Sequence, residues 1–82
     1  MEQSNQFKVY VSVTAELSDE GVITPLSFVW ENGRRYSIDK VLDIRQAPSL
    51  KAGGYGLRFS VMVYGKPTYL WLHENRWYME RK

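Results

Sequence analysis

Cysteine is absent from this chain of 82 residues, and there is a single histidine. The absence of cysteine excludes disulfides and thiolate metal sites and is compatible with a reducing compartment. No apolar run approaches the ~20 residues of a membrane-spanning helix. No segment has the periodicity of a long amphipathic helix either. What remains favours a small domain built from strands.

The first six residues also lack a recognisable signal. They are polar, and Glu2 is their only charged residue. A secretory signal peptide would need a basic start followed by an apolar stretch. We therefore predict a disordered lead-in over residues 1–6, one domain over residues 7–82, and a cytoplasmic location.

The groups that catalysis needs are missing as well. His73 is followed by Glu74, but neighbours in a strand face opposite sides, so they make a poor acid–base pair. Asp39 and Asp43 would lie ~13 Å apart along a regular strand, too far for a glycosidase pair at about 5 to 9 Å. We interpret them as surface acids that pair with arginines. The sequence predicts a protein that is not an enzyme and holds no metal or cofactor.

Alternating apolar and polar residues are the dominant pattern that is present. Hydrophobic residues make up 44% of the chain and aromatic residues 15%, enough for a core without covalent staples. The alternation predicts about six antiparallel strands in sequential hairpins, an all-β meander. Such a sheet must curl to bury its apolar face, into an SH3-like barrel or half-barrel. The expected strands cover residues 7–17, 22–30, 34–44, 57–64, a segment ending near 73, and 77–80.

The longest interruption of this pattern covers residues 46–56 and includes Gly53-Gly54-Tyr55-Gly56. It lacks the Lys-Ser/Thr pair of a phosphate-binding loop. We interpret it as a flexible connector, in which residues 49–52 form one helical turn that Gly53 terminates.

The hairpin over residues 26–38 specifies its own register. A two-residue Asn-Gly turn would place Phe28 opposite Ser37, a polar residue beside a large apolar one. A three-residue loop over residues 31–33 instead pairs Phe28 with Tyr36 and puts Gly33 in the left-handed position. In this register Trp30 faces Arg34 and Leu26 faces Ile38. The sequence predicts a type I turn with a glycine bulge, and Pro25 beside an edge or bulge.

The later hairpin suggests a binding surface. A turn at Gly65-Lys66 would pair Val61 with Leu70 and Phe59 with Leu72. The opposite face then carries aromatic side chains with a basic flank, which the sheet either buries or offers to a partner. We predict a non-catalytic binding or adaptor module, most favourably for a protein partner. The candidate contact residues are Arg58, Met62, Tyr64, Tyr69 and Trp71.

The charge distribution supports an alternative, a weak single-stranded nucleic-acid binding domain. Residues 33–66 hold seven bases and two acids, whereas residues 1–32 hold one base and five acids. Basic side chains would neutralise phosphates while Tyr69 and Trp71 stack on bases. The candidate phosphate contacts are Arg34, Arg35, Lys40 and Lys66, with Arg58. We expect no membrane partner, and either a monomer or a dimer paired through a strand edge.

The first hairpin also resembles a known group of domains. Residues 25–30, Pro-Leu-Ser-Phe-Val-Trp, precede residues 33–38, Gly-Arg-Arg-Tyr-Ser-Ile. This pattern resembles that of short bacterial all-β domains of unknown function, and residues 56–61, 69–70 and 77–80 also fit it. Some of those domains look to be encoded beside, or fused to, translesion DNA polymerases. The resemblance implies no established activity, only DNA-related partners. A Gly-rich segment follows Asp43 where those domains carry more tryptophan.

Overall fold

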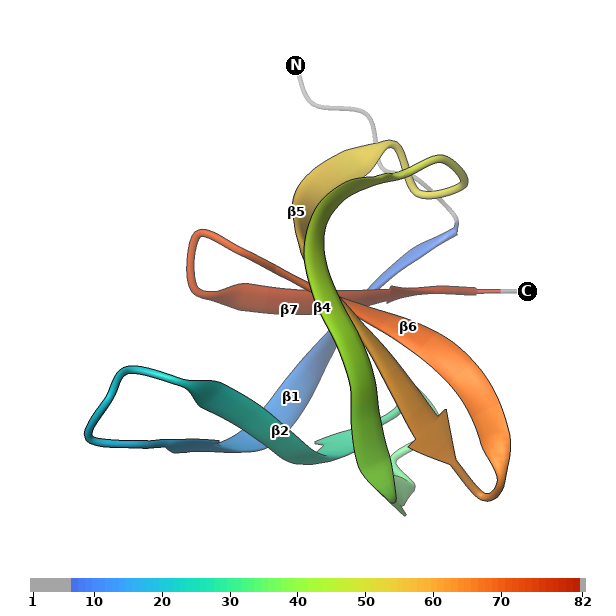
Figure 1. Ribbon diagram of the computed structural model, residues 1–82. Coiled ribbons are helices and arrows are strands. Elements are labelled where there is room, and N and C mark those ends of the chain that lie inside the picture. Colours follow the sequence, from blue (N-terminus) through green and yellow to red (C-terminus); the bar gives the residue numbers. More distant parts are fainter. Residues whose placement is uncertain (1–6, 82) are drawn as a thin grey trace.

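The computed structural model describes residues 7–81, and the lead-in predicted over residues 1–6 lies outside them. All of the regular structure in this range is β (Figure 1). The all-β prediction is confirmed, with seven strands in place of about six. The strands are β1 (Lys8–Leu17), β2 (Ile23–Val29), β3 (Arg35–Ser37), β4 (Lys40–Ser49), β5 (Gly54–Val63), β6 (Lys66–His73) and β7 (Arg76–Glu80).

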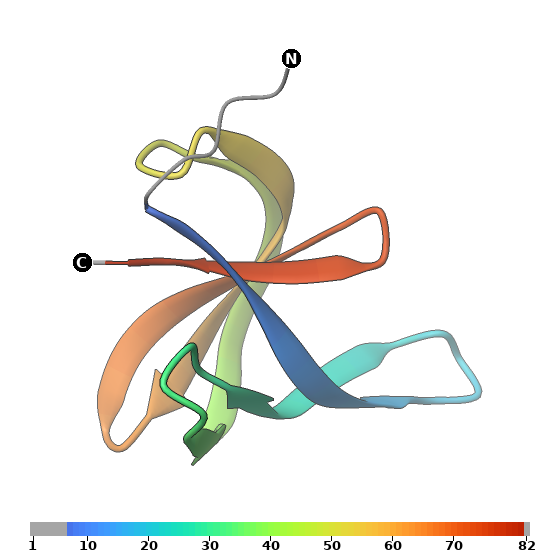
Figure 2. The same cartoon turned by 180° about the vertical axis from the view of Figure 1, so that it is seen from behind.

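The seven strands form one antiparallel sheet in the order β3-β2-β1-β7-β6-β5-β4. The first and last strands therefore pair in the middle of the sheet, from Lys8 opposite Glu80 to Val11 opposite Trp77. The two edges are β3 and β4, which follow each other in the chain. The sheet is strongly twisted and curls into a half-barrel (Figures 1 and 2), as predicted.

The segment expected as one strand over residues 34–44 is two strands on opposite edges of the sheet, so that prediction was wrong. Residues 35–37 pair with β2, and β4 pairs with β5 from Lys40 onward. Between them Ile38 N donates to Leu26 O at 2.8 Å and Asp39 N donates to Met62 O at 2.7 Å. This link holds the two edges together across the opening of the half-barrel.

The register predicted for the first hairpin is confirmed. Phe28 lies opposite Tyr36, Gly33 has a φ of +83°, and Trp30 N donates to Arg34 O at 2.9 Å. The neighbouring ladder also contains the expected irregularity beside Pro25. Thr14 pairs with Ser27 and Ala15 with Pro25, so Leu26 is the extra residue of a bulge and is 44% exposed.

The register predicted for β5 and β6 was wrong by two residues. Phe59 lies opposite Leu70, and the pair that closes the hairpin is Val63 with Lys66. The turn is therefore Tyr64-Gly65, and both residues have positive φ, +52° and +74°, as a primed two-residue turn requires. Because the shift is an even number, each residue keeps its predicted face.

Apolar residues on the concave face form the main core. They come from β1, β2, β5, β6 and β7, and Phe59, Val61 and Leu70 are at most 1% exposed. Side chains from five strands meet only because the sheet curls. The buried members are Val9, Val11, Phe28, Phe59, Val61, Leu70 and Met79.

A second, smaller cluster lies on the convex face. The rings of Trp71 and Tyr78 stack with centroids 5.5 Å apart, and Ala52 from the β4–β5 turn packs with them. A Cβ on Gly54 would lie 2.5 Å from the hydroxyl of Tyr78, and one on Gly56 would lie 2.6 Å from the backbone oxygen of Leu72. The tip of the β4–β5 hairpin therefore folds closely over this face.

The Gly-rich segment is consequently not the flexible connector that we predicted. β4 runs on to Ser49 and β5 begins at Gly54, because glycine lets the strand approach Tyr78. Only residues 50–53 turn the chain. There Gly53 N donates to Ser49 O at 2.8 Å, and this single helical turn ending at Gly53 matches the prediction.

Candidate functional site

The most open part of the sheet lies between β6 and β7. These strands pair only at Trp71–Tyr78, Leu72–Trp77 and His73–Arg76. From Leu70 back to Lys66, β6 remains paired with β5, and from Met79 to Glu80, β7 remains paired with β1. The two strands therefore diverge and leave a wedge-shaped gap (Figure 1).

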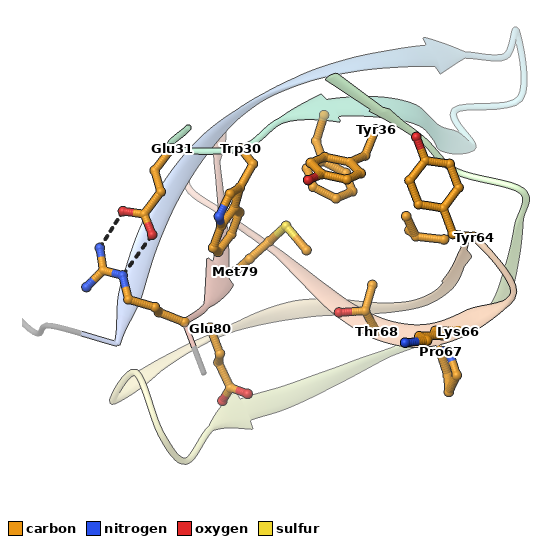
Figure 3. Close-up of a pocket in the computed structure, with 12 residues that line it drawn as sticks. Trp30, Glu31, Tyr36, Tyr64, Lys66, Pro67, Thr68, Met79 and Glu80 are labelled. Atoms are coloured by element: carbon orange, nitrogen blue, oxygen red, sulfur yellow. Dashed lines mark hydrogen bonds and ion pairs between the residues drawn. The ribbon is translucent and has the colours of Figure 1, made fainter. Parts of the chain in front are cut away.

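A groove of about 520 Å³ lies on the concave side of this gap. Trp30 and Tyr64 stand at its two ends, with Met79 between them (Figure 3). The groove brings together the end of β2, strand β3, the β5–β6 turn and the end of β7. Its lining residues are Phe28, Trp30, Glu31, Tyr36, Val63, Tyr64, Lys66, Pro67, Thr68, Met79, Glu80 and Arg81.

Aromatic rings hold one another in place along the groove. Tyr36 stacks on the buried Phe28, with centroids 5.5 Å apart, and meets Tyr64 edge to face at 5.7 Å. Tyr64 is nevertheless 71% exposed, because it occupies the first position of the tight β5–β6 turn. Such rings offer a large contact area with little conformational freedom to lose on binding.

The charges at the Trp30 end of the groove neutralise each other. Arg81 donates two hydrogen bonds to the carboxylate of Glu31, at 2.7 and 2.9 Å. This hydrogen bonding holds the pKa of Glu31 below its ordinary value of 4.5 and raises the pKa of Arg81. The pair closes one end of the groove without leaving a net charge there.

At the opposite end the balance is different. Lys66 is exposed, and within residues 7–81 it forms no ion pair. Glu80 faces away toward the β4–β5 turn, where it accepts a hydrogen bond from Ser49 Oγ at 2.8 Å. The Tyr64 end of the groove therefore carries a positive charge that an anionic group can meet.

The convex side of the same gap has a hollow of about 310 Å³. It shares Pro67, Thr68, Glu80 and Arg81 with the groove, and adds Lys51 and Tyr69. The groove and the hollow are thus the two faces of one gap between strands.

The predicted partner-binding residues do not form one surface. Trp71 is 2% exposed, because Ala52 of the β4–β5 turn covers it. Of the two alternatives for this face, burial holds at Trp71, and its candidate role as a partner contact was wrong. Tyr69 is 45% exposed, with the guanidinium carbon of Arg58 4.3 Å from its ring centroid. Met62 is half-buried on the same convex face, whereas Tyr64 lies at the concave groove.

The predicted phosphate contacts are also dispersed. Arg35 donates to the hydroxyls of Thr14 and Ser27, at 3.3 and 3.1 Å. Arg34 precedes Arg35 in the chain, so the two leave the strand in opposite directions. Lys40 begins β4, and Lys66 lies at the groove. The four residues therefore belong to different elements, and no single strand presents them together.

The remaining candidates have ordinary surface roles. Asp43 accepts a hydrogen bond from Arg45 Nε at 2.6 Å, which is the main cause of its lowered pKa and matches the predicted arginine pairing. His73 is exposed, 3.8 Å from the carboxylate of Glu74. Within residues 7–81 no three potential metal ligands come together. No helix in this range is long and apolar enough to span a membrane.

The groove itself was not predicted from the sequence. Of its lining residues, Tyr64 was a candidate partner contact and Lys66 a candidate phosphate contact, and the other lining residues were not among the candidates. One sequence signal pointed to it, namely Pro67 inside an otherwise regular strand. Since proline has no N–H to donate, it marks a strand position with no neighbour on that side.

Comparison of the chain with family models, with curated proteins and with solved structures found no match. The fold and the gap define a small all-β half-barrel with an open aromatic groove.

Proposed function

We propose that this protein is a non-catalytic binding module, and that the groove between β6 and β7 holds a segment of a partner protein. The observation that carries the proposal is the pair of aromatic walls, Trp30 and Tyr64, standing over an apolar floor. Tyrosine and tryptophan are the residues most enriched at the energetic centres of protein interfaces.

Three physical features support this use of the groove. Its volume of about 520 Å³ suits a few side chains rather than a whole protein surface. Its walls stand on paired strands and short turns, so little ordering is needed on binding. Its rim contains the ion pair of Glu31 with Arg81 and, at the opposite end, Lys66, which forms no ion pair within residues 7–81. The two ends of the groove therefore differ in charge.

Selection of displayed random peptides on the immobilised domain tests the proposal. We expect enriched peptides to lose about tenfold or more in affinity for Tyr64→Ala and Trp30→Ala, the loss typical of a central aromatic contact. The matched control is Tyr55→Ala, because Tyr55 is 54% exposed and lines neither side of the gap. Equal binding to Tyr64→Ala and Tyr55→Ala, or no enriched peptide, would contradict the proposal.

A second candidate function is weak binding of single-stranded nucleic acid on the convex face. Each of two exposed tyrosines has an arginine side chain over its ring. The guanidinium carbon of Arg58 lies 4.3 Å from the ring centroid of Tyr69, and that of Arg76 lies 3.5 Å from the ring centroid of Tyr10. Bases stack on such rings while cations meet the phosphates. The resemblance to domains found beside translesion polymerases agrees with this alternative.

Fluorescence anisotropy with a labelled oligothymidylate tests it. Binding through phosphates requires an affinity that falls steeply as salt increases and that drops for Arg76→Gln and Tyr69→Ala. Glu16→Gln serves as a surface control. No binding at low salt would eliminate this alternative and leave the peptide-binding proposal intact.

A further inference from the structure

The turn between β5 and β6 determines which backbone groups of β6 face the gap. Because Tyr64-Gly65 is a two-residue turn, the residues that flank it, Val63 and Lys66, form a hydrogen-bonded pair. Hydrogen-bonded and non-hydrogen-bonded pairs alternate along an antiparallel ladder. The N–H and C=O groups of Thr68 and Leu70 therefore point to β5.

By the same alternation the backbone groups of residues 67, 69, 71 and 73 point toward β7. The β6–β7 turn leads to this assignment independently. Glu74-Asn75 is also a two-residue turn with positive φ, +50° and +65°, so His73 pairs with Arg76 and Trp71 with Tyr78 through hydrogen bonds. The ladder ends at that pair, which leaves Tyr69 facing the gap with no strand opposite.

The free edge of β6 is therefore short. It consists of the N–H and C=O of Tyr69 and the C=O of Pro67, since proline has no N–H. Across the gap Glu80 holds the corresponding position on β7. Arg81 N donates to Phe7 O, so by the same alternation the backbone groups of Met79 point to β1 and those of Glu80 point to the gap. An edge with one proline resists pairing with long strands but still accepts a short one.

The other long edge, that of β4, is less suited to this role. Its register shifts at Leu42, it carries the ion pair Asp43–Arg45, and Pro48 interrupts its far end. A bulge, charges and proline are the features by which proteins block an edge from pairing. The edge of β6, in contrast, opens directly onto the aromatic groove.

Side chains set the chemistry of the occupant. A strand laid along β6 would direct alternate side chains into the groove, over Met79 and between Trp30 and Tyr64. Apolar residues fit these positions. The next inward position lies at the turn end of β6, beside Lys66, which forms no ion pair within the described range. Charge complementarity therefore favours a carboxylate there.

Building on the binding function proposed above, we infer that the partner segment binds by strand addition. It is an extended peptide with apolar residues at alternate positions and an acidic residue at the end nearest Lys66. Its backbone pairs with the N–H and C=O of Tyr69 and thereby continues the sheet from β6 into the gap.

Amide hydrogen exchange of the ¹⁵N-labelled domain tests this mode. In the protein alone we expect the Tyr69 amide to exchange at least about tenfold faster than those of Thr68 and Leu70, which pair with β5. On addition of a peptide enriched by display on the groove, the Tyr69 amide should slow about tenfold or more, with little change at Thr68 and Leu70. These two amides are the internal controls.

Two variants isolate the backbone contribution. Tyr69→Ala removes the ring, and Tyr69→Pro also removes the N–H and fixes φ. Once the fold is shown to be kept, their difference in affinity reports the loss of the amide. We expect Tyr69→Pro to bind at least about threefold more weakly than Tyr69→Ala, the value of one net hydrogen bond. Near-ultraviolet circular dichroism checks that both fold. If Tyr69→Pro does not fold, the same comparison is made with peptides N-methylated at successive residues, where methylation of the amides that face β6 must abolish binding.

The outcomes separate this inference from the function on which it rests. Groove-dependent peptides that leave the Tyr69 amide unprotected, tolerate every N-methylation or share an uninterrupted proline-rich motif would overturn strand addition and retain the binding function. Loss of the difference between Tyr64→Ala and Tyr55→Ala would overturn both. A Lys66→Glu variant should change the preference of selected peptides at one end from an acidic to a basic residue. An unchanged preference would contradict the placement of the acidic residue beside Lys66.

Discussion

Two hairpins of this sheet, β4–β5 and β6–β7, differ in how far they stay closed. β4 and β5 pair almost from end to end, from Lys40 opposite Met62 to Ser49 opposite Gly54. β6 and β7 pair at three positions and then diverge. Both are antiparallel and both have short turns, so turn geometry alone does not decide how long a ladder becomes.

The difference in ladder length follows from the other contacts that each hairpin makes. The tip of β4–β5 has a surface to pack on, because Ala52 covers Trp71 and Tyr78 and Ser49 Oγ donates to Glu80. In β6–β7 each strand follows another partner, β5 or β1. A closed hairpin thus covers the convex face, and an open one creates the groove.

The largest effect that bears on this contrast is expected from Gly56→Ala. The new Cβ would lie 2.6 Å from the backbone oxygen of Leu72, and backbone yields little, so the loss of unfolding free energy should be about 3 kcal/mol. Gly54→Ala should cost less, because the atom it meets is the hydroxyl end of Tyr78. Urea denaturation measures both. Equal, small costs would show that the tip does not pack closely.

The next effect concerns pH. Burial raises the pKa of Tyr78 to about 12, with Glu80 and Tyr10 contributing. Because the neutral phenol is the form favoured in the folded state, the stabilisation is present below pH 10 and is lost as pH rises from 10 toward 12. The wild type should lose about 2 to 3 kcal/mol over this range relative to Tyr78→Phe.

Tyr78→Phe also tests the burial of the Tyr78 hydroxyl near neutral pH. The buried hydroxyl has no hydrogen-bond partner within residues 7–81, so its removal should be neutral or stabilising. Tyr55→Phe is the exposed control in both conditions. A stability loss for Tyr78→Phe near neutral pH would mean that the hydroxyl is satisfied by water beneath the tip.

A smaller effect is expected in the loop that follows Trp30. Gly33→Ala forces a side chain into a φ of +83° with open space around it, and should cost about 1 to 2 kcal/mol. Asn32→Ala removes the acceptor for Arg34 N at 2.9 Å in an exposed loop, at about 0.5 kcal/mol. Thermal denaturation of the two variants compares them, and equal costs would contradict the glycine-bulge geometry.

The smallest stability change, within about 0.5 kcal/mol, should follow Pro67→Thr at the open hairpin. Restoring an N–H at this edge makes β6 a better template for pairing. Sedimentation velocity should therefore show more self-association for the variant than for the wild type, without loss of the fold. Pro48→Thr, on the edge strand β4, is the comparison. A monomeric Pro67→Thr variant would mean that the gap is too narrow to admit a strand.

Much of this fold could be predicted because strand alternation and the Glu31-Asn32-Gly33 loop are local signals. The loop specified the register of β2 with β3, and the alternation specified the faces of β5 and β6. The turn at Tyr64-Gly65 was not predicted, since a tyrosine with φ of +52° has no distinctive local pattern. Its position depends on the sheet around it.

The candidate site could be predicted only in part. The aromatic side chains were visible in the sequence, but which of them are covered depends on contacts between distant residues. Trp71 is buried by the turn near Ala52, and Gly54 allows that approach. From the sequence alone, a glycine-rich segment predicts flexibility and not a close contact. Likewise the groove depends on the β1–β7 pairing, which draws Met79 away from β6 and which no local pattern specifies.

The same β1–β7 pairing has a consequence for how the protein folds. Arg81 N donates to Phe7 O at 2.7 Å, so positions 7 and 81 are neighbours in space, whereas the link at residues 38–39 crosses the opening of the half-barrel. A circular permutant with residues 7 and 81 joined and the chain opened at 38–39 would have its strands in the order in which they lie in the sheet. Every strand pair would become local, and the low contact order predicts faster folding. In the natural chain the contact of longest range is the pairing of β1 with β7. In the permutant this contact becomes a local one.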